Sequence, residues 1–451
     1  MGKYFGTDGV RGIANTELSC KLAFQVGQAG AIVLTEQLHH KPTILIGKDT
    51  RISGDMLEAA MVAGICSVGA NAMLLGVVPT PAVAHLTRKY QADAGIVISA
   101  SHNPMEYNGI KFFDGQGYKL SDELEARLEN LIDKKEELPL KEGGEIGWVV
   151  RAESAVEDYV QFLCETVETP INGLKVAVDC ANGAASATAK KLFLALGVEA
   201  DVFFDTPDGT NINAGCGSTH LNVVGDIVKK GSYDLGIAFD GDADRFLCVD
   251  ENGDEIDGDK IIAACACQLK QEGKLDKNSV VVTVMTNLGF FVMGKEQGID
   301  IKTTKVGDRY VLEEMVSGGY SLGGEQSGHI IFSLHNTTGD GQLTALKFLQ
   351  VLRAQGKKAS EVATIMDTYP QILINVPLIS NEAKEQCEKD AEVLAEIRAV
   401  EEKLGEHGRV LVRPSGTERL TRVMLEGKNY EEIRTHANRI ADIIKRKFGM
   451  R

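Results

Sequence analysis

Positive charge is the first thing that this sequence has little of. Its 48 lysine and arginine residues face 64 aspartate and glutamate residues, which gives a formal net charge of −16. Nonspecific binding to nucleic acid or to an anionic membrane requires a basic surface, so we expect no nucleic-acid and no membrane partner. A local cluster of arginine and lysine can still reverse the field inside a cleft, so an anionic small molecule is compatible with this composition.

The sequence also lacks closely paired cysteines and an apolar opening segment, so we expect no signal peptide. Its nine cysteines form no C-x-x-C pair, which indicates reduced core thiols in a cytoplasmic protein. The opening MGKYFGTDGVRG has no apolar stretch of the kind that directs secretion. The run 59–87 contains no charged residue and has the length of a membrane span, but glycine and proline interrupt it. We interpret it as a buried helix, a strand over 72–77 and a turn at residues 79–81.

What the sequence does have is an alternation of short apolar strands with helices. In the first part we expect helices over 22–38 and 56–69 and strands over 43–48, 72–77 and 94–98. The layout of strand, small-residue loop and helix restarts near residues 174 and 280. After residue 370 the pattern becomes a strand, a long polar helix over roughly 381–404, two strands around a loop, and an amphipathic C-terminal helix. This order predicts α/β domains with covered sheets, followed by a smaller α+β domain.

An acidic loop is the strongest chemical signal. Asp240, Asp242 and Asp244 alternate in DGDADR directly after the apolar run LGIAF, so they lie at the end of a buried strand. Three carboxylates at this spacing can converge on one hard cation. An EF-hand is the obvious rival, but its required glycine at position six is Arg245 here and the flanks are strands. A simple acidic turn explains the motif poorly, because three buried carboxylates repel one another without a cation.

A serine motif follows another apolar strand. The segment SASHNP comes after AGIVI and contains Ser101 and His102. A serine on a strand-to-loop turn can present its hydroxyl as a nucleophile or as a phosphate carrier. Taken alone, a capped turn before Pro104 explains the segment equally well. Downstream, Lys111 is a candidate proton donor or phosphate ligand.

Two further loops suit a phosphorylated sugar. Arg413-Pro414-Ser415-Gly416-Thr417, with Arg422 close behind, can form a phosphate cradle, although an ordinary hairpin turn accounts for it equally well. The segment GGEQSGH offers the side chains of Glu325, Gln326 and Ser327 to sugar hydroxyls, and its His329 suits acid–base chemistry near neutral pH. Together the four loops imply a metal, a hydroxyl nucleophile, a polar pocket and a separate phosphate cradle.

In this order and spacing, the four loops resemble the α-D-phosphohexomutase family over essentially the whole chain. The resemblance implies three related α/β domains with mixed sheets and a smaller C-terminal α+β domain around a central cleft. The expected domains are a phosphoserine-loop domain over 1–152, a metal-loop domain over 153–254, a sugar-loop domain over 255–369 and a phosphate-binding domain over 370–451.

The resemblance also implies a role for each candidate residue. Ser101 is then the phosphorylated serine and, with Asp240, Asp242 and Asp244, a ligand of one Mg²⁺ ion. Lys111 and His329 are the expected proton-transfer groups, and Arg11, His102 and Arg245 are expected to support the catalytic site. Substrate binding is expected from Glu325, Ser327, Arg413, Ser415, Gly416, Thr417 and Arg422. A hexose or hexosamine 1,6-bisphosphate is the expected activator.

Within the family, GEQSGH points to glucosamine 6-phosphate as substrate, because enzymes acting on glucose or mannose phosphates more typically carry methionine in place of Gln326. The product, glucosamine 1-phosphate, would feed UDP-N-acetylglucosamine synthesis. One departure is Arg419, which stands where the family's phosphate loop usually has proline and is expected to loosen that loop. A glucose or mannose phosphomutase, a metal-dependent sugar phosphatase and a non-catalytic sugar-phosphate binding protein are the rivals. A homodimer is compatible with the family.

Overall fold

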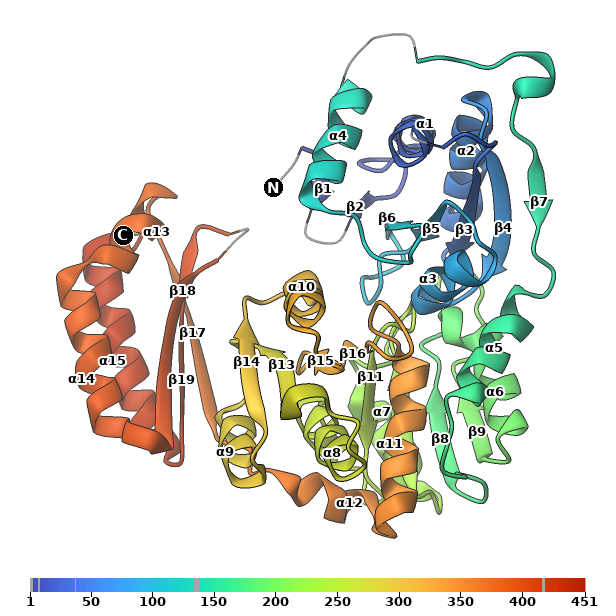
Figure 1. Cartoon of the computed structure of the whole chain (residues 1–451). Helices are drawn as coiled ribbons and strands as arrows, with labels where there is room; N and C mark the ends of the chain where they lie inside the picture. Colours follow the sequence, from blue (N-terminus) through green and yellow to red (C-terminus); the bar gives the residue numbers. More distant parts are fainter. Residues whose placement is uncertain (1–2, 7–8, 37, 134–137, 416–417, 451) are drawn as a thin grey trace. The chain divides into compact units, whose positions relative to one another are not determined.

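The computed structural model describes residues 3–6, 9–36, 38–133, 138–415 and 418–450. The chain packs as two compact units. Unit 1 comprises Met1–Met285 and Gly298–Ile365, and unit 2 comprises Thr286–Gln297 and Met366–Arg451. The element order confirms the expected series of α/β layers with a smaller C-terminal α+β part (Figure 1).

The first sheet of unit 1 has seven strands in the order β1-β2-β6-β5-β3-β4-β7. They are β1 (Phe5–Gly6), β2 (Gly9–Ile13), β3 (Thr43–Lys48), β4 (Asn71–Val77), β5 (Ala94–Ile98), β6 (Tyr107–Asp114) and β7 (Val149–Arg151). The helices of this part are α1 (Cys20–Thr35), α2 (Ser53–Ser67), α3 (Thr80–Lys89) and α4 (Asp122–Asp133). Strands β3, β4 and β5 are parallel, whereas β6 runs antiparallel to β5 and to β2, so the sheet is mixed.

Helices cover both faces of this sheet. On one face, Ile44 and Ile46 of β3 belong to a core that includes residues of α1, α2 and α4. On the other face, a side chain at Gly47 or Gly95 would collide with Val83 of α3, so glycine lets that helix pack closely. The run 59–87 thus divides into α2, β4 and α3, and the predicted turn at 79–81 is where α3 begins. Among the described residues, no helix combines the length and the hydropathy needed to cross a membrane.

Two further sheets complete unit 1. The second has the order β12-β11-β10-β8-β9, and the third has the order β14-β13-β15-β16. The strands are β8 (Lys175–Asp179), β9 (Glu199–Phe203), β10 (Leu235–Phe239), β11 (Phe246–Val249), β12 (Glu255–Ile256), β13 (Ser279–Thr283), β14 (Asp300–Thr304), β15 (Leu322–Gly324) and β16 (Ile330–Phe332). The helices are α5 (Ala155–Glu165), α6 (Ala189–Ala195), α7 (Leu221–Lys230), α8 (Gly258–Gln271), α10 (Asp308–Gly318), α11 (Gly341–Gln355) and α12 (Ala359–Val362).

Unit 2 is built on an antiparallel sheet in the order β17-β19-β18. Its elements are β17 (Gln371–Pro377), β18 (Gly408–Pro414), β19 (Leu420–Gly427), α9 (Leu288–Gln297), α13 (Glu382–Lys389), α14 (Ala391–Leu404) and α15 (Tyr430–Phe448). Helices α14 and α15 lie side by side on one face, where their apolar residues share a core with the sheet (Figure 1).

The prediction of one long helix over 381–404 was wrong, because the chain breaks into α13 and α14 at Asp390. The Asp390 backbone is extended, and its carboxylate accepts hydrogen bonds from the amides of Glu392 and Val393. An aspartate that caps a helix in this way starts a new helix instead of continuing the old one.

Candidate functional site

Ser101 stands on a turn just beyond β5. Its backbone φ is +53°, in the left-handed region that residues other than glycine, asparagine and aspartate rarely adopt. The side chain is buried, and its hydroxyl donates to Asp240 Oδ2 at 2.6 Å. His102 Nδ1 lies 3.3 Å from the same hydroxyl oxygen. The turn therefore directs the hydroxyl at the acidic loop, 139 residues further along the chain.

A buried ion pair between Asp49 and Arg51 holds this turn in place. The Arg51 guanidinium donates to the main-chain oxygens of Ser101 at 2.9 Å, Asn103 at 2.8 Å and Pro104 at 2.5 Å. Asp49 accepts from the Ser99 hydroxyl at 2.6 Å and from Arg51 Nε at 2.9 Å. The sequence predicted the strand over 43–48, but it did not indicate this role for the residues that follow the strand.

Asn213 is a second anchor that sequence reasoning missed. Its amide donates to the main-chain oxygens of Ser101 at 2.9 Å and Asn103 at 3.1 Å. No sequence pattern singles it out, because its targets are backbone carbonyls, which every residue carries.

The acidic loop lies between β10 and β11. Asp240, Asp242 and Asp244 are 1%, 1% and 4% exposed, and each offers an oxygen within 4.8 Å of the other two. Gly241 allows this loop to approach the serine turn, because a Cβ there would lie only 2.6 Å from the Ser101 carbonyl oxygen. Burial, and then the charges of the other two carboxylates, raise the pKa of Asp240 well above its usual value.

This donor set fits a hard cation. Asp242 Oδ1 and Asp244 Oδ1 are buried and accept no hydrogen bond from any described residue. Buried carboxylate oxygens in proteins are normally hydrogen-bonded or coordinate a metal. The three carboxylates, with an adjacent hydroxyl oxygen, form an all-oxygen set of the kind that Mg²⁺ and Ca²⁺ prefer. Part of the repulsion is offset by Lys111, whose ammonium lies 2.9 Å from Asp242 Oδ2 and 3.6 Å from Asp244 Oδ2.

Thr80 is a further contact of the acidic loop that the sequence did not indicate. Its hydroxyl donates to Asp242 Oδ2 at 2.7 Å, and its amide donates to the Asp242 carbonyl oxygen at 2.9 Å. Thr80 is the first residue of α3, so the helix start and the acidic loop are fixed together.

His329 packs against the same loop through its ring. Its Nδ1 lies 3.6 Å from Asp244 Oδ2, and its Nε2 accepts the Gly339 amide at 3.1 Å. Burial opposes protonation of the ring, but the carboxylates of Asp244 and Asp308 outweigh it and raise the pKa of His329. For Asp244, burial is likewise outweighed by Lys111 and His329, and its pKa is lowered.

The three residues expected to support the catalytic site, Arg11, His102 and Arg245, all lie in unit 1. The Arg245 amide donates to Asp240 Oδ1 at 3.2 Å, and its Nε lies 3.9 Å from Asp244 Oδ1. Arg11 lies on β2, opposite Gly109 of β6. Burial, and then the charges of Arg245 and Arg11, lower the pKa of His102 to about 4, so its ring is neutral at pH 7.

The sugar-loop candidates lie between β15 and β16. Glu325 accepts the Gly307 amide at 3.0 Å, and burial raises its pKa. Gln326 donates to Asp257 Oδ2 at 3.1 Å, and Asp257 caps the N-terminus of α8. The Ser327 side chain is exposed. This loop lies near the metal-loop residues, because Arg245 and His329 form an isolated β-bridge.

The phosphate-loop candidates belong to unit 2. Arg413 of β18 and Arg422 of β19 face each other directly across the antiparallel pair. Like charges in this position are destabilising, so the pair favours an anion between or beside them. Burial, and then Arg422, lower the pKa of Arg413. Ser415 is 4% exposed and its hydroxyl accepts the Glu418 amide at 3.1 Å, whereas Gly416 and Thr417 lie outside the described residues.

The structure therefore brings Ser101, His102, Lys111, the three aspartates, Arg245 and His329 together within unit 1. A buried hydroxyl aimed at a carboxylate cluster, with a lysine and a histidine beside it, is an arrangement suited to phosphoryl transfer.

Family models identify the class of protein. Four models described as phosphoglucomutase/phosphomannomutase match the chain in sequence order. Alpha/beta/alpha domain I matches residues 2–139, domain II 157–253, domain III 257–369 and the C-terminal domain 373–443. The chain therefore belongs to the phosphoglucomutase/phosphomannomutase family, a family of phosphosugar mutases, which are isomerases.

Curated relatives at more than 50% identity carry a more particular name. A protein of Clostridium novyi (strain NT) named phosphoglucosamine mutase is 58% identical over 448 residues, covering 99% of each chain. Another of that name, from Clostridium acetobutylicum, is 56% identical over 448 residues, covering 99% of this chain and 100% of the relative.

Solved structures share the fold. A phosphoglucomutase/phosphomannomutase family protein of Burkholderia thailandensis superposes with a TM-score of 0.82 at 22% identity, covering 98% of this chain and 99% of that one. An N-acetylphosphoglucosamine mutase of Aspergillus fumigatus, crystallised with GlcNAc-6P and magnesium, superposes with a TM-score of 0.69 at 17% identity, covering 98% and 95%.

Proposed function

We propose that this protein is a phosphosugar mutase that interconverts glucosamine 6-phosphate and glucosamine 1-phosphate. The observation that carries the proposal is the buried Ser101 hydroxyl, 2.6 Å from Asp240 in the carboxylate cluster. The substrate is inferred from the relatives named phosphoglucosamine mutase, which match this chain along its whole length. We place the reaction in the cytoplasm and assign its product to UDP-N-acetylglucosamine synthesis.

In this proposal Ser101 Oγ carries a phosphoryl group. The phosphoryl passes to the free hydroxyl of the bound sugar phosphate, the Ser101 O–P bond breaks, and a sugar bisphosphate forms. The bound bisphosphate then reorients so that its other end faces Ser101. Transfer of that second phosphoryl group to Ser101 completes the isomerisation. A trace of 1,6-bisphosphate serves as activator because it phosphorylates any enzyme that has lost its phosphoryl group.

Asp240, Asp242 and Asp244 would hold one Mg²⁺ ion together with the phosphoryl oxygen on Ser101. When bound, the ion neutralises charge on the transferred phosphoryl group. Lys111 and His329 are the proton-transfer candidates of the chain itself. Lys111 is placed to protonate the serine oxygen as the phosphoryl leaves, because its ammonium already lies in the carboxylate cluster. His329 is engaged at both ring nitrogens and so also orients Asp244.

Arg413, Ser415 and Arg422, with Gly416 and Thr417, would hold the phosphate that is not reacting. The facing arginines support this assignment, because a bound phosphate offsets their mutual repulsion. Glu325 and Ser327 would contact sugar hydroxyls, and Arg11, His102 and Arg245 would stabilise the serine turn and the transferred group.

The proposal is tested by converting glucosamine 6-phosphate to glucosamine 1-phosphate with Mg²⁺ and a trace of hexose 1,6-bisphosphate. Wild type is compared with Ser101→Ala and with Ser232→Ala, which alters an exposed serine and serves as the matched control. We expect turnover by wild type and by the control, and loss of most turnover in Ser101→Ala. Digestion and mass spectrometry should place one phosphoryl group on the peptide that contains Ser101.

Other outcomes would change the proposal in distinct ways. Good turnover of glucose or mannose phosphates with none of glucosamine 6-phosphate would retain the mechanism and reject the substrate. Equal turnover by wild type and Ser101→Ala would reject the phosphoserine route. Net release of inorganic phosphate, unaffected by Arg413→Ala, would indicate a metal-dependent phosphatase.

A further inference from the structure

Unit 1 contains a cavity that has no part in the proposed reaction. Its volume is about 530 Å³, within the range of small-molecule sites in proteins. Helices α8 and α11, strand β16 with the loop after it, and the loop after α5 form its walls. None of the residues that line it belongs to the serine turn, the acidic loop or the sugar loop.

The wall of this cavity is largely apolar and is fixed by hydrogen bonds. Phe332, Leu269, Val351 and Cys265 supply apolar surface. The loop after α5 is held over the cavity by Gln350, whose side-chain oxygen accepts the amides of Glu168 at 2.9 Å and Thr169 at 3.1 Å. The cavity is therefore formed in advance, which reduces the entropy that a ligand must lose on binding.

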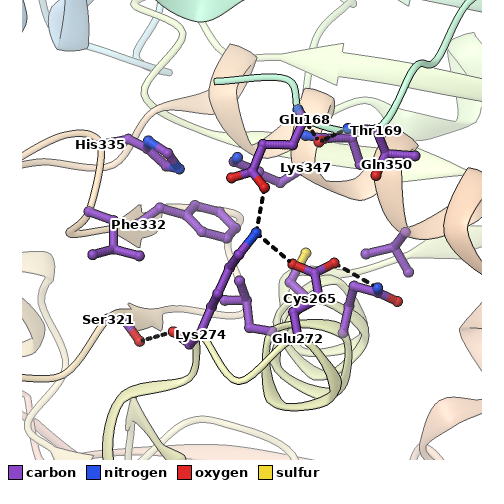
Figure 2. A pocket seen from close by; sticks show the side chains of 14 residues that line it. Glu168, Thr169, Cys265, Glu272, Lys274, Ser321, Phe332, His335, Lys347 and Gln350 are labelled. Atoms are coloured by element: carbon purple, nitrogen blue, oxygen red, sulfur yellow. Dashed lines mark hydrogen bonds and ion pairs between the residues drawn. The ribbon is translucent and has the colours of Figure 1, made fainter. Parts of the chain in front are cut away.

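Lys274 extends across the cavity between two carboxylates. Figure 2 shows its ammonium between Glu168 and Glu272, with Phe332 and His335 to one side. The Glu272 contact is 3.1 Å long. Each of these carboxylates thus already has a cationic partner, so neither is available as the chief partner of a ligand.

Lys347 is the second lysine of the cavity, and it forms no direct ion pair with a described residue, although the charge of Glu168 acts on it. Its ammonium donates to the Thr166 carbonyl oxygen at 2.6 Å, and no carboxylate of a described residue lies within ion-pair distance of it. An ammonium can donate three hydrogen bonds, so two of its protons are open to a ligand. Burial lowers the pKa of Lys347, and burial together with Lys347 lowers the pKa of His335 to about 4. The shift of Lys347 reflects the cost of keeping its charge away from water, which an anionic partner would relieve.

We propose that this cavity binds a small organic anion with an apolar body, whose anionic group pairs with Lys347 and whose body packs on Phe332 and Leu269. The apolar wall distinguishes this ligand from a sugar phosphate, which is polar on all sides. Because Glu168 and Glu272 are paired with Lys274, they attract a cationic ligand less than free carboxylates would. The sign of the ligand charge therefore depends on Lys347.

The helices α8 and α11 and the strand β16, which line the cavity, begin beside the loops of the candidate active site. Helix α11 begins at Gly341, whose amide donates to the Ala243 carbonyl oxygen of the acidic loop at 3.0 Å. Helix α8 begins beside Gln326, and β16 directly follows His329. A ligand in the cavity would thus contact the same elements that carry the site, although it would touch none of the reacting groups.

The test uses three compounds with one body and different head groups: 4-phenylbutyrate, 4-phenylbutan-1-ol and 4-phenylbutylamine. Binding to the full-length protein is measured by calorimetry at pH 7.5. We expect the carboxylate to bind at least tenfold more tightly than the alcohol, and the amine to bind more weakly still. Lys347→Met, which keeps the aliphatic stem, should weaken carboxylate binding at least tenfold, whereas Lys229→Met at an exposed position should not change it.

A second variant tests whether the ligand binds in this cavity. Leu269→Trp fills the cavity from α8 and should abolish carboxylate binding while the mutase reaction continues. The proposal is wrong if the alcohol or the amine binds as tightly as the carboxylate, or if Leu269→Trp leaves binding unchanged. It is equally wrong if Lys347→Met folds and binds normally, or if the carboxylate has a Kd above about 10 mM. If Lys347→Met does not fold, the head-group series and Leu269→Trp decide the matter.

Discussion

Binding of Mg²⁺ to the acidic loop should stabilise the protein measurably, and Asp240→Asn should remove that effect. A ligand at 100 times its Kd stabilises the folded state by about 2.7 kcal/mol. For a unit of this size, about 2 °C per kcal/mol is expected, so the melting temperature should rise by about 5 °C. The rise is measured by differential scanning fluorimetry, starting in chelator and adding Mg²⁺ to saturation.

Asp240→Asn is informative because it changes charge without changing shape. The amide can still accept the Arg245 main-chain N–H and can donate to the Ser101 hydroxyl, which Asp240 contacts at 2.6 Å. One negative charge leaves a cluster of three, so the metal-free variant should melt within a few degrees of wild type or above it.

The Mg²⁺-induced rise should nevertheless fall below about 1 °C in Asp240→Asn, because one ligand is lost. Asp226→Asn, at an exposed position on α7, is the matched control and should keep the full rise. A full rise in Asp240→Asn, or no rise in wild type, would refute the assignment of the acidic loop as the metal site.

Three further outcomes are expected. Arg51→Lys keeps the charge but loses the fork that holds the Ser101 carbonyl oxygen, so kcat should fall about a hundredfold with little change in KM; an unchanged kcat in steady-state assays would contradict this. Burial lowers the pKa of His85 to about 4, so its ring is neutral in the folded protein at pH 7. Above pH 6.5 the ring is also neutral in the unfolded chain, and stability does not depend on its protonation. As the pH falls from 6.5 towards 4, only the unfolded chain binds the proton, so the free energy of unfolding falls by about 1.4 kcal/mol per pH unit. His85→Phe should therefore show a smaller fall in melting temperature between pH 7 and 5 than wild type. Identical falls in the two proteins would contradict this role of His85. Arg422→Met should raise KM for the sugar phosphate about tenfold or more, yet leave the ligand-free protein no less stable, because it removes the charge opposite Arg413; a clear loss of melting temperature would show that the pair is structural.

The motifs that could be read from the sequence are those in which chemistry-bearing residues directly follow an apolar strand. LGIAF and AGIVI became β10 and β5, both fully buried, so the residues after them had to emerge at strand ends. Burial of three carboxylates in DGDADR was enough to indicate a cation, because their repulsion needs an opposite charge. The strand-end position and the charge pattern together locate the site before any tertiary contact is known.

The contacts that position Ser101 could not be read in the same way. Arg51 and Asn213 bind its carbonyl oxygen from 50 residues before and 112 residues after it. A backbone carbonyl carries no side-chain identity, so nothing in the segment SASHNP specifies which donor will reach it. Lys111 shows a related limit: its position after β5 suggested a proton donor or a phosphate ligand, but its place among the aspartates depends on the pairing of β6 with β5.

Local chemistry also misled the interpretation in two places. Residues 381–404 have uninterrupted helical composition, yet Asp390 caps α14 and divides the run. Residues 79–81 read as a turn, yet proline is well tolerated in the first turn of a helix, and α3 begins there. In both cases the sequence contained the signal, but the same residues are compatible with either structure until the packing of the neighbouring elements decides.

Each unit gathers charges of a single sign, negative in unit 1 and positive in unit 2. In unit 1, Asp240, Asp242 and Asp244 are buried together, and in unit 2, Arg413 and Arg422 face each other across neighbouring strands. The repulsion in each cluster opposes folding, although Lys111 offsets part of it in unit 1 and Glu418, 3.4 Å from Arg422, offsets part of it in unit 2. In the proposed function, a divalent cation would neutralise the first cluster and a phosphate group would neutralise the second. Relief of the repulsion within each unit would then add to the binding energy, so Asp240→Asn should weaken cation binding, and Arg422→Met phosphate binding, much more than either weakens stability.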